Sequence, residues 1–141
     1  MEVRYSPAGP VVGRFHRSGA FIRGLMGPVG SSKSSACCVE MFRRACAQAA
    51  YNGVRRTRWA AVRNTYGELE TTTIKTFREW FPFAEFKTGS PITATMSVPL
   101  PDGTRVEAEF WFFPLDRPEE IRKLRSLEIT GAWVNEASEV P

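Results

Sequence analysis

Residues 21–34 read FIRGLMGPVGSSKS, an apolar run followed by a glycine- and serine-rich turn that carries a lysine. Gly27, Lys33 and Ser34 stand at the offsets of the pattern G-x-x-x-x-G-K-[ST], in which backbone N–H groups surround a phosphate and the hydroxyl residue binds magnesium. Ser32 takes the place of the second glycine, which a serine can do if its φ is negative or the loop relaxes slightly. We therefore expect residues 21–26 to form a strand that leads into a phosphate-binding loop. The simpler alternative is a flexible turn with a chance lysine.

Composition limits the class of protein. The chain has 141 residues, of which 43% are hydrophobic, enough for one domain with a core. Its net charge of +4 is compatible with a polyanionic partner or with ordinary solvated basic faces. The three cysteines lack metal-ligand spacing and read as reduced core thiols. With no signal-peptide pattern and no long apolar stretch, we expect an intracellular protein without a membrane partner.

Hydrophobic periodicity predicts an alternation of helices and strands after the loop. Helices are expected at 35–50 with a left-handed cap at Asn52-Gly53, at 71–81, and from 118 to 124; strands are expected at 59–62, 91–99, 104–113 and 129–134. Pro101-Asp102-Gly103 is a hairpin signal between two of these strands. The pattern favours an α/β fold with a mostly parallel sheet, an inserted antiparallel hairpin, and ligands at the carboxyl ends of the strands.

The last predicted strand ends in a candidate for the second half of a nucleotide site. Residues 131–136 read GAWVNE, so Asn135 and Glu136 follow four mostly apolar residues. An NTPase needs a carboxylate that orients the attacking water and a polar group on the metal side. Glu136 suits the first role, and Asn135 supplies an uncharged amide for the second, so magnesium would depend more on Ser34 and the phosphates. The simpler interpretation of Glu136 is an exposed residue after an edge strand.

Three stretches of the chain resemble a known family. They are GPVGSSKSSACCVEMFRRA (27–45), RWAAVRNTYGELETTTIKTFREWFP (58–82) and LPDGTRVEAEFWFFPLDRPEEIRKLRSLEITGAWVNEASEVP (100–141). Together they are similar to the N-terminal ATPase part of the terminase large subunits of tailed bacteriophages. The combination of RNTY-x-EL with GAWVNEA is more specific than the loop alone.

The resemblance implies a P-loop NTPase of the additional-strand, catalytic-glutamate type that uses ATP and Mg²⁺. Such a motor would self-associate as a ring around double-stranded DNA and package it into the prohead in the host cytoplasm, with a portal protein and a small terminase subunit as partners. By position, Lys33 would contact the β- and γ-phosphates, Ser34 and Asn135 would lie on the metal side, and Glu136 would activate water. The other nucleotide-binding positions implied are Gly27, Gly30, Ser31, Ser32, Ser35, Arg63 and Tyr66, although Arg63 could equally cap a strand edge.

The resemblance also implies missing parts. Many relatives carry an arginine where Val29 stands, so a charge-stabilising arginine would come from elsewhere. The chain ends at Pro141, immediately after the predicted glutamate strand, the Walker B strand. We therefore expect one partial ATPase domain over 1–141, with a lead-in segment at 1–20, and without the next core strand or the nuclease domain. Such a fragment should hydrolyse ATP feebly or not at all.

Two other functions stay open at this stage. The chain could be a non-catalytic remnant that binds nucleic acid or a protein partner, with Ser32 and Asn135 as marks of lost activity. It could also be another P-loop enzyme, such as a small-molecule kinase or a helicase-like ATPase, although no clustered-arginine lid is evident. The candidates for DNA phosphate contact are Arg55, Arg56 and Arg58, which read equally as surface charge. Phe15 and His16 could flank a base, but packing is the simpler interpretation.

Overall fold

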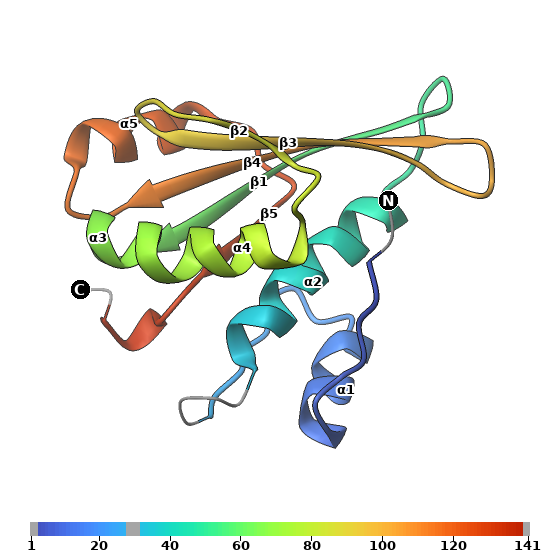
Figure 1. Cartoon of the computed structure of the whole chain (residues 1–141), viewed down its shortest axis with the longest axis horizontal. Coiled ribbons are helices and arrows are strands. Elements are labelled where there is room, and N and C mark those ends of the chain that lie inside the picture. Colours follow the sequence, from blue (N-terminus) through green and yellow to red (C-terminus); the bar gives the residue numbers. More distant parts are fainter. Residues whose placement is uncertain (1–2, 28–31, 140–141) are drawn as a thin grey trace.

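A mixed five-stranded sheet forms the centre of the molecule (Figure 1). The structure, a computed structural model, describes residues 3–27 and 32–139. The strands are β1 (Val54–Arg63), β2 (Glu85–Lys87), β3 (Ile92–Pro99), β4 (Arg105–Pro114) and β5 (Gly131–Val134), in the spatial order β2-β3-β4-β1-β5. β1 pairs in parallel with both β4 and β5, whereas β3 is antiparallel to β4 and β2 is antiparallel to β3. The fold is therefore α/β, with three parallel strands extended by an antiparallel pair.

Helices cover both faces of the sheet. They are α1 (Pro10–Arg17), α2 (Lys33–Ala47), α3 (Tyr66–Glu68), the π-helical η1 (Leu69–Ile74), α4 (Lys75–Trp80), α5 (Pro118–Ser126) and the 3₁₀ turn η2 (Ala137–Glu139). The segments α3, η1 and α4 follow one another without a break. Figure 1 shows this continuous helix and α2 below the sheet and α5 above it. α1 packs against α2, on the outer side of that layer.

The main core lies between the sheet and the α2–α4 layer. Phe77 of α4 is fully buried, and its ring contacts Phe81 as well as Phe110 and Phe112 of β4. Alternate residues of β3 and β4 point into this core, which is why both strands show a period of two in their burial. A smaller cluster under α5 contains Ala60, Val62 and Phe113. Both faces of β1 are therefore buried near its carboxyl end.

Most of the predicted elements form. The hairpin at Pro101-Asp102-Gly103 is confirmed, with Gly103 at φ 87, and the predicted helix after Asp116 is α5. Asn52 and Gly53 do have positive φ, but the helix already ends at Ala47. The pair instead forms the turn that leads into β1, since Tyr51 and Val54 exchange backbone hydrogen bonds. The antiparallel extension makes the sheet mixed rather than mostly parallel, and α1 lies in a segment for which we expected no element.

The predicted strand at 21–26 is wrong. Residues 21–27 have no regular secondary structure, and the exposed fractions of Phe21, Ile22 and Met26 are 102%, 83% and 93%. An extended apolar segment becomes a strand only where a neighbour pairs with its N–H and C=O groups. β5 is the last strand on this side of the sheet within the described residues, and 21–26 does not pair with it. Within the described residues, α2 is therefore not preceded by a strand of the sheet.

Candidate functional site

The lysine of the predicted loop opens helix α2. Ser32 precedes it as the N-cap residue, with φ 65 and ψ 23, in the left-handed region, and its carbonyl accepts the hydrogen bond of the Ala36 N–H. Of the two ways in which we expected a serine to be accommodated, a negative φ is not the one observed: Ser32 adopts the conformation for which a glycine is usually needed. Among the described residues, no side chain caps the first turn of α2, and no acidic residue lies in that turn. The N–H groups of this turn and the helix dipole therefore favour an anion.

Lys33 bends back over the start of the loop. Its Nζ donates a hydrogen bond to the carbonyl oxygen of Gly27. This hydrogen bond links the first and last residues of the segment 27–33. Ser34 and Ser35 are half-buried in the first turn of the helix. Gly30 and Ser31, together with Val29, lie outside the described residues, so their predicted phosphate contacts stay predictions.

At the end of β5, Glu136 also has a left-handed backbone, with φ 54. It is half-buried. The residue before it, Asn135, is buried, and its Nδ2 donates a hydrogen bond to Oγ1 of Thr73 in η1 at 2.8 Å. The predicted metal-side role would require the carbonyl oxygen of this amide, because the nitrogen is held by Thr73. That role stays a prediction.

The fold brings the two halves of the predicted site onto neighbouring elements. α2 and β5 are in contact, and Trp133 of β5 belongs to the same core cluster as Cys38 and Met41 of α2. Figure 1 shows that β5 ends on the side of the molecule from which α2 starts. Lys33 opens α2 and Glu136 follows β5, so the two predicted residues stand at those ends of α2 and β5 that lie on the same side of the molecule.

Arg63 and Tyr66, the predicted base contacts, have other partners. The Arg63 side chain donates to Oγ1 of Thr72 at 3.0 Å, and its Nε lies 3.5 Å from a carboxylate oxygen of Glu68. The guanidinium carbon of Arg117 lies 3.7 Å from the centre of the Tyr66 ring. Partial burial, followed by the nearby Glu70 carboxylate, raises the pKa of the Tyr66 hydroxyl. These contacts fit the alternative in which Arg63 fastens the end of β1 to the following helix.

Two of the three arginines considered for DNA contact are paired within the protein. Arg55 binds Asp102 at 3.0 Å and also donates to Thr104 and to the carbonyl of Gln48. Arg58 binds Glu109 at 2.6 Å. Arg56 is exposed. The pairing favours the surface-charge interpretation of the first two.

Metal and thiol chemistry find little support elsewhere. Within residues 3–27 and 32–139 no group of three histidine, cysteine or acidic side chains could hold a metal ion. The cysteines are free, as expected, and burial raises the pKa of the Cys37 thiol to about 11, which makes it a poor nucleophile. In the same part of the chain, no helix is both long and apolar enough to cross a membrane.

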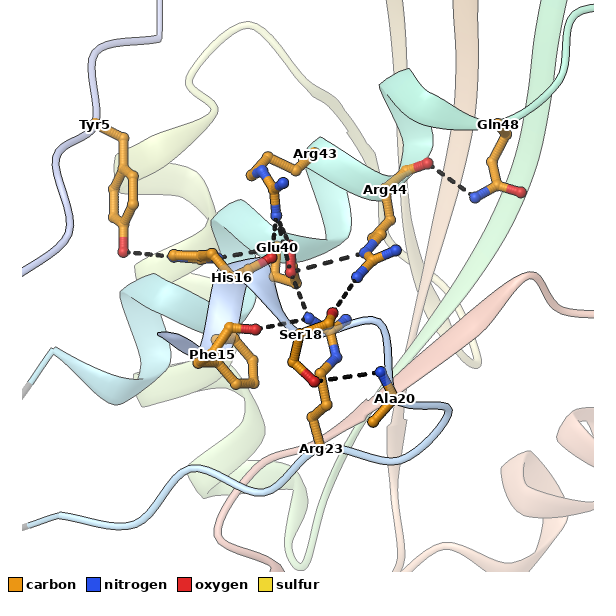
Figure 2. A network of polar contacts seen from close by, with 10 residues as sticks. All are labelled: Tyr5, Phe15, His16, Ser18, Ala20, Arg23, Glu40, Arg43, Arg44 and Gln48. Atoms are coloured by element: carbon orange, nitrogen blue, oxygen red, sulfur yellow. Dashed lines mark hydrogen bonds and ion pairs between the residues drawn. The ribbon is translucent and has the colours of Figure 1, made fainter. Parts of the chain in front are cut away.

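Sequence reasoning missed a buried charge cluster next to the loop (Figure 2). Glu40 of α2 is 5% exposed and is surrounded by Arg23, Arg43 and Arg44, with His16 Nδ1 at 3.5 Å. His16 is buried, and its Nε2 lies 2.8 Å from the Tyr5 hydroxyl oxygen, which fits the packing interpretation of this residue. Glutamate three and four residues before two arginines is a visible helix signal, but nothing in the sequence indicates that Arg23 joins it.

Comparisons with known proteins identify no relative: no protein-family model, no curated protein and no solved structure matches the chain.

Proposed function

We propose that this chain binds ATP with Mg²⁺ between residues 27–34 and the end of β5, as part of the ATPase of a terminase-like DNA-packaging motor. In this proposal Lys33 and the first turn of α2 bind the phosphates, Ser34 binds the metal, and Glu136 orients the attacking water. Double-stranded DNA, a ring of further copies, a portal protein and a small terminase subunit are the partners that the resemblance implies.

The observation that carries the proposal is that both halves of the predicted site have a left-handed residue at an element end, Ser32 before α2 and Glu136 after β5. Of the described non-glycine residues, Ser32, Asn52 and Glu136 have positive φ, and two of these three belong to the predicted site. Such conformations cost about 1–2 kcal/mol each and are concentrated at functional sites. Ser32 turns the chain so that Lys33 begins α2, and Glu136 turns it away from β5.

The chemistry at the start of α2 fits a phosphate. The N–H groups of the first turn, which no side chain of the described residues caps, favour negative charge, and so do the absence of acidic residues in that turn and the lysine. A phosphate bound there would compete with the Gly27 carbonyl for the Lys33 ammonium. Because a phosphate is charged, it makes the stronger hydrogen bond and would take the lysine over.

ATP binding tests the phosphate half of the proposal. We expect titration calorimetry with ATP and Mg²⁺ to give at least about tenfold weaker binding for Lys33→Ala, because one charge-assisted hydrogen bond is lost. Lys75→Ala, which removes the same charge from an exposed position on α4, should bind as the unaltered chain does. Equal affinities of the two variants, or no binding by the unaltered chain at millimolar ATP, would overturn the proposal.

ATP turnover tests the role of Glu136. In any longer protein whose reading frame includes this chain, the Glu136→Gln variant should bind ATP normally and lose hydrolysis; this chain alone is expected to hydrolyse ATP feebly or not at all. A non-catalytic, binding-only function is the second candidate, and Asn135 favours it, because an uncharged amide that is buried and hydrogen-bonded to Thr73 takes the place where a metal would gain more from a carboxylate. If such a longer protein binds ATP but does not hydrolyse it even with Glu136 intact, the second candidate is correct.

A further inference from the structure

We call residues 23–27 the loop root. Glu40 lies at the centre of the charge cluster that joins the loop root to α1 and α2. The carboxylate is 6% exposed at the side chain and binds Arg23 at 2.7 Å and Arg43 through the opposite oxygen. Nε of Arg44 lies 3.8 Å away. Figure 2 shows the three guanidinium groups and His16 arranged around this one acid. Three cations facing one carboxylate leave a surplus of positive charge, so each arginine depends on Glu40 for its position.

The same three arginines bind the carboxyl end of α1. Arg23 donates to the carbonyl of Phe15 at 2.9 Å, Arg43 to that of His16 at 2.9 Å, and Arg44 to that of Ser18 at 2.7 Å. These carbonyls belong to the last turn of α1 and its cap, where carbonyls lack the regular intrahelical partner, although that of Phe15 also accepts the Ser18 N–H at 3.3 Å. Cations are favourable there because of the helix dipole. Glu40 thus orients three arginines that fasten α1 to α2.

Arg23 differs from the other two because it belongs to the loop root. It stands four residues before Gly27, whose carbonyl receives Lys33. Glu40 and Lys33 are seven residues apart on α2, which places them on the same face of the helix, about 10 Å apart along its axis. The loop root is therefore joined to one face of α2 at two points, Arg23–Glu40 and Gly27–Lys33.

From this arrangement we infer that Glu40, acting through Arg23, is a positioning residue that holds the loop root against α2 so that Gly27 meets Lys33. The inference rests on the proposed function only for its consequence, which is that the loop is held ready for phosphate. Without Glu40 the three arginines repel one another, and the loop root is attached to α2 through Gly27–Lys33 and not through Arg23.

Nuclear magnetic resonance relaxation tests the inference without any nucleotide. In the unaltered chain, the backbone N–H order parameters of residues 24–27 should resemble those of rigid backbone, about 0.85, and should fall below about 0.6 in Arg23→Met and in Glu40→Gln. Arg43→Met is the matched control, since it removes a guanidinium from the same carboxylate without touching the loop root. Arg23→Lys, which keeps a cation for Glu40, should restore much of the order.

Nucleotide binding then separates the inference from the proposed function. With the site as proposed, Arg23→Met and Glu40→Gln should bind ATP about tenfold more weakly, while Arg43→Met binds as the unaltered chain does. Order parameters unchanged in Arg23→Met, or lowered equally in Arg43→Met, would overturn the positioning role. Loss of order confined to Arg23→Met and Glu40→Gln, in a chain that binds no ATP, would support the positioning role and overturn the proposed function instead.

Discussion

Two apolar runs of this chain differ in structure: one forms a buried strand and the other forms no strand. Residues 59–62, WAAV, lie in β1 at the middle of the parallel strands and are at most 7% exposed. Residues 21–26, FIRGLM, are equally suited to a strand by composition, yet they form none, and Phe21 is fully exposed. The difference lies in the neighbours: β1 has β4 on one side and β5 on the other, whereas 21–26 is paired with neither edge of the sheet. An apolar run becomes a strand where backbone partners exist, and apolar character alone does not provide them.

The largest test of this comparison is one charge placed in each run. Val62→Asp puts a carboxylate into the cluster under α5, where it has no partner, and should cost about 4 kcal/mol or more of unfolding free energy. Ile22→Asp changes a side chain that is 83% exposed and should stay within about 0.5 kcal/mol. Urea denaturation followed by circular dichroism measures both. A large loss of stability in Ile22→Asp would mean that residues 21–26 are buried in solution.

A second test addresses the packing between β1 and β5. A Cβ built on Gly131 would lie 2.5 Å from a ring carbon of Trp59, so Gly131→Ala forces the indole or the short strand to move. We expect a loss of about 2 kcal/mol in stability, the range of overpacked cores.

Gly67→Ala is the matched control for that substitution. Gly67 lies in α3 with nothing within 4 Å of its would-be Cβ, and alanine favours a helix. The control should raise the unfolding free energy by about 0.5–1 kcal/mol. If both variants have the same stability in thermal unfolding, the close approach of Gly131 to Trp59 does not hold.

The contrast between residues 59–62 and 21–26 also explains which helices and strands could be predicted from the sequence. Periodicity located α2, the β3–β4 hairpin and α5, because in each the apolar residues face a core that the pattern itself implies. It failed at 21–26, because strand formation there depends on a neighbour that no local pattern specifies. It missed α1, a helix of eight residues whose carboxyl end is held by arginines from elsewhere in the chain.

The candidate site was predicted in part for similar reasons. The spacing of Lys33 and Ser34 from Gly27 is local, and so is the position of Glu136 after β5. The partners of Asn135 and Arg63 are not, since Thr73 and Thr72 belong to η1, a π-helical turn that the 3.6-residue period does not indicate. From the sequence, Glu40 is one polar residue on a helix face. The hydrogen bond that it accepts from Arg23 is evident only from the fold.

A third test concerns the backbone at the junction of the exposed run and α2. Ser32→Gly should relieve about 1 kcal/mol of left-handed strain, partly offset by the added freedom of glycine in the unfolded chain, for a net gain of about 0.5 kcal/mol. Ser35→Gly, three residues into the helix, should instead lose about 0.5 kcal/mol because glycine weakens helices. Opposite signs in chemical denaturation sharpen the comparison. Two losses would show that Ser32 does not adopt a positive φ in solution.

The smallest expected effect lies at the polar start of β1, which forms a strand although residues 54–58 read VRRTR. Asp102 at the hairpin tip accepts hydrogen bonds from Thr104 and from Arg55, and these, with Thr104 first, lower the pKa of Asp102 to about 2. A lowered pKa means that the carboxylate stabilises the fold above its unfolded pKa, about 3.9, and that this contribution is lost as the pH falls toward 2. Asp102→Asn should therefore melt slightly below the unaltered chain at pH 6, and the two melting temperatures should converge between pH 4 and about pH 2. A carboxyl titration midpoint near 4 in carbon-13 spectra would show that Arg55 and Thr104 do not form these hydrogen bonds with Asp102. Backbone pairing with β4 would then be what makes residues 54–58 a strand.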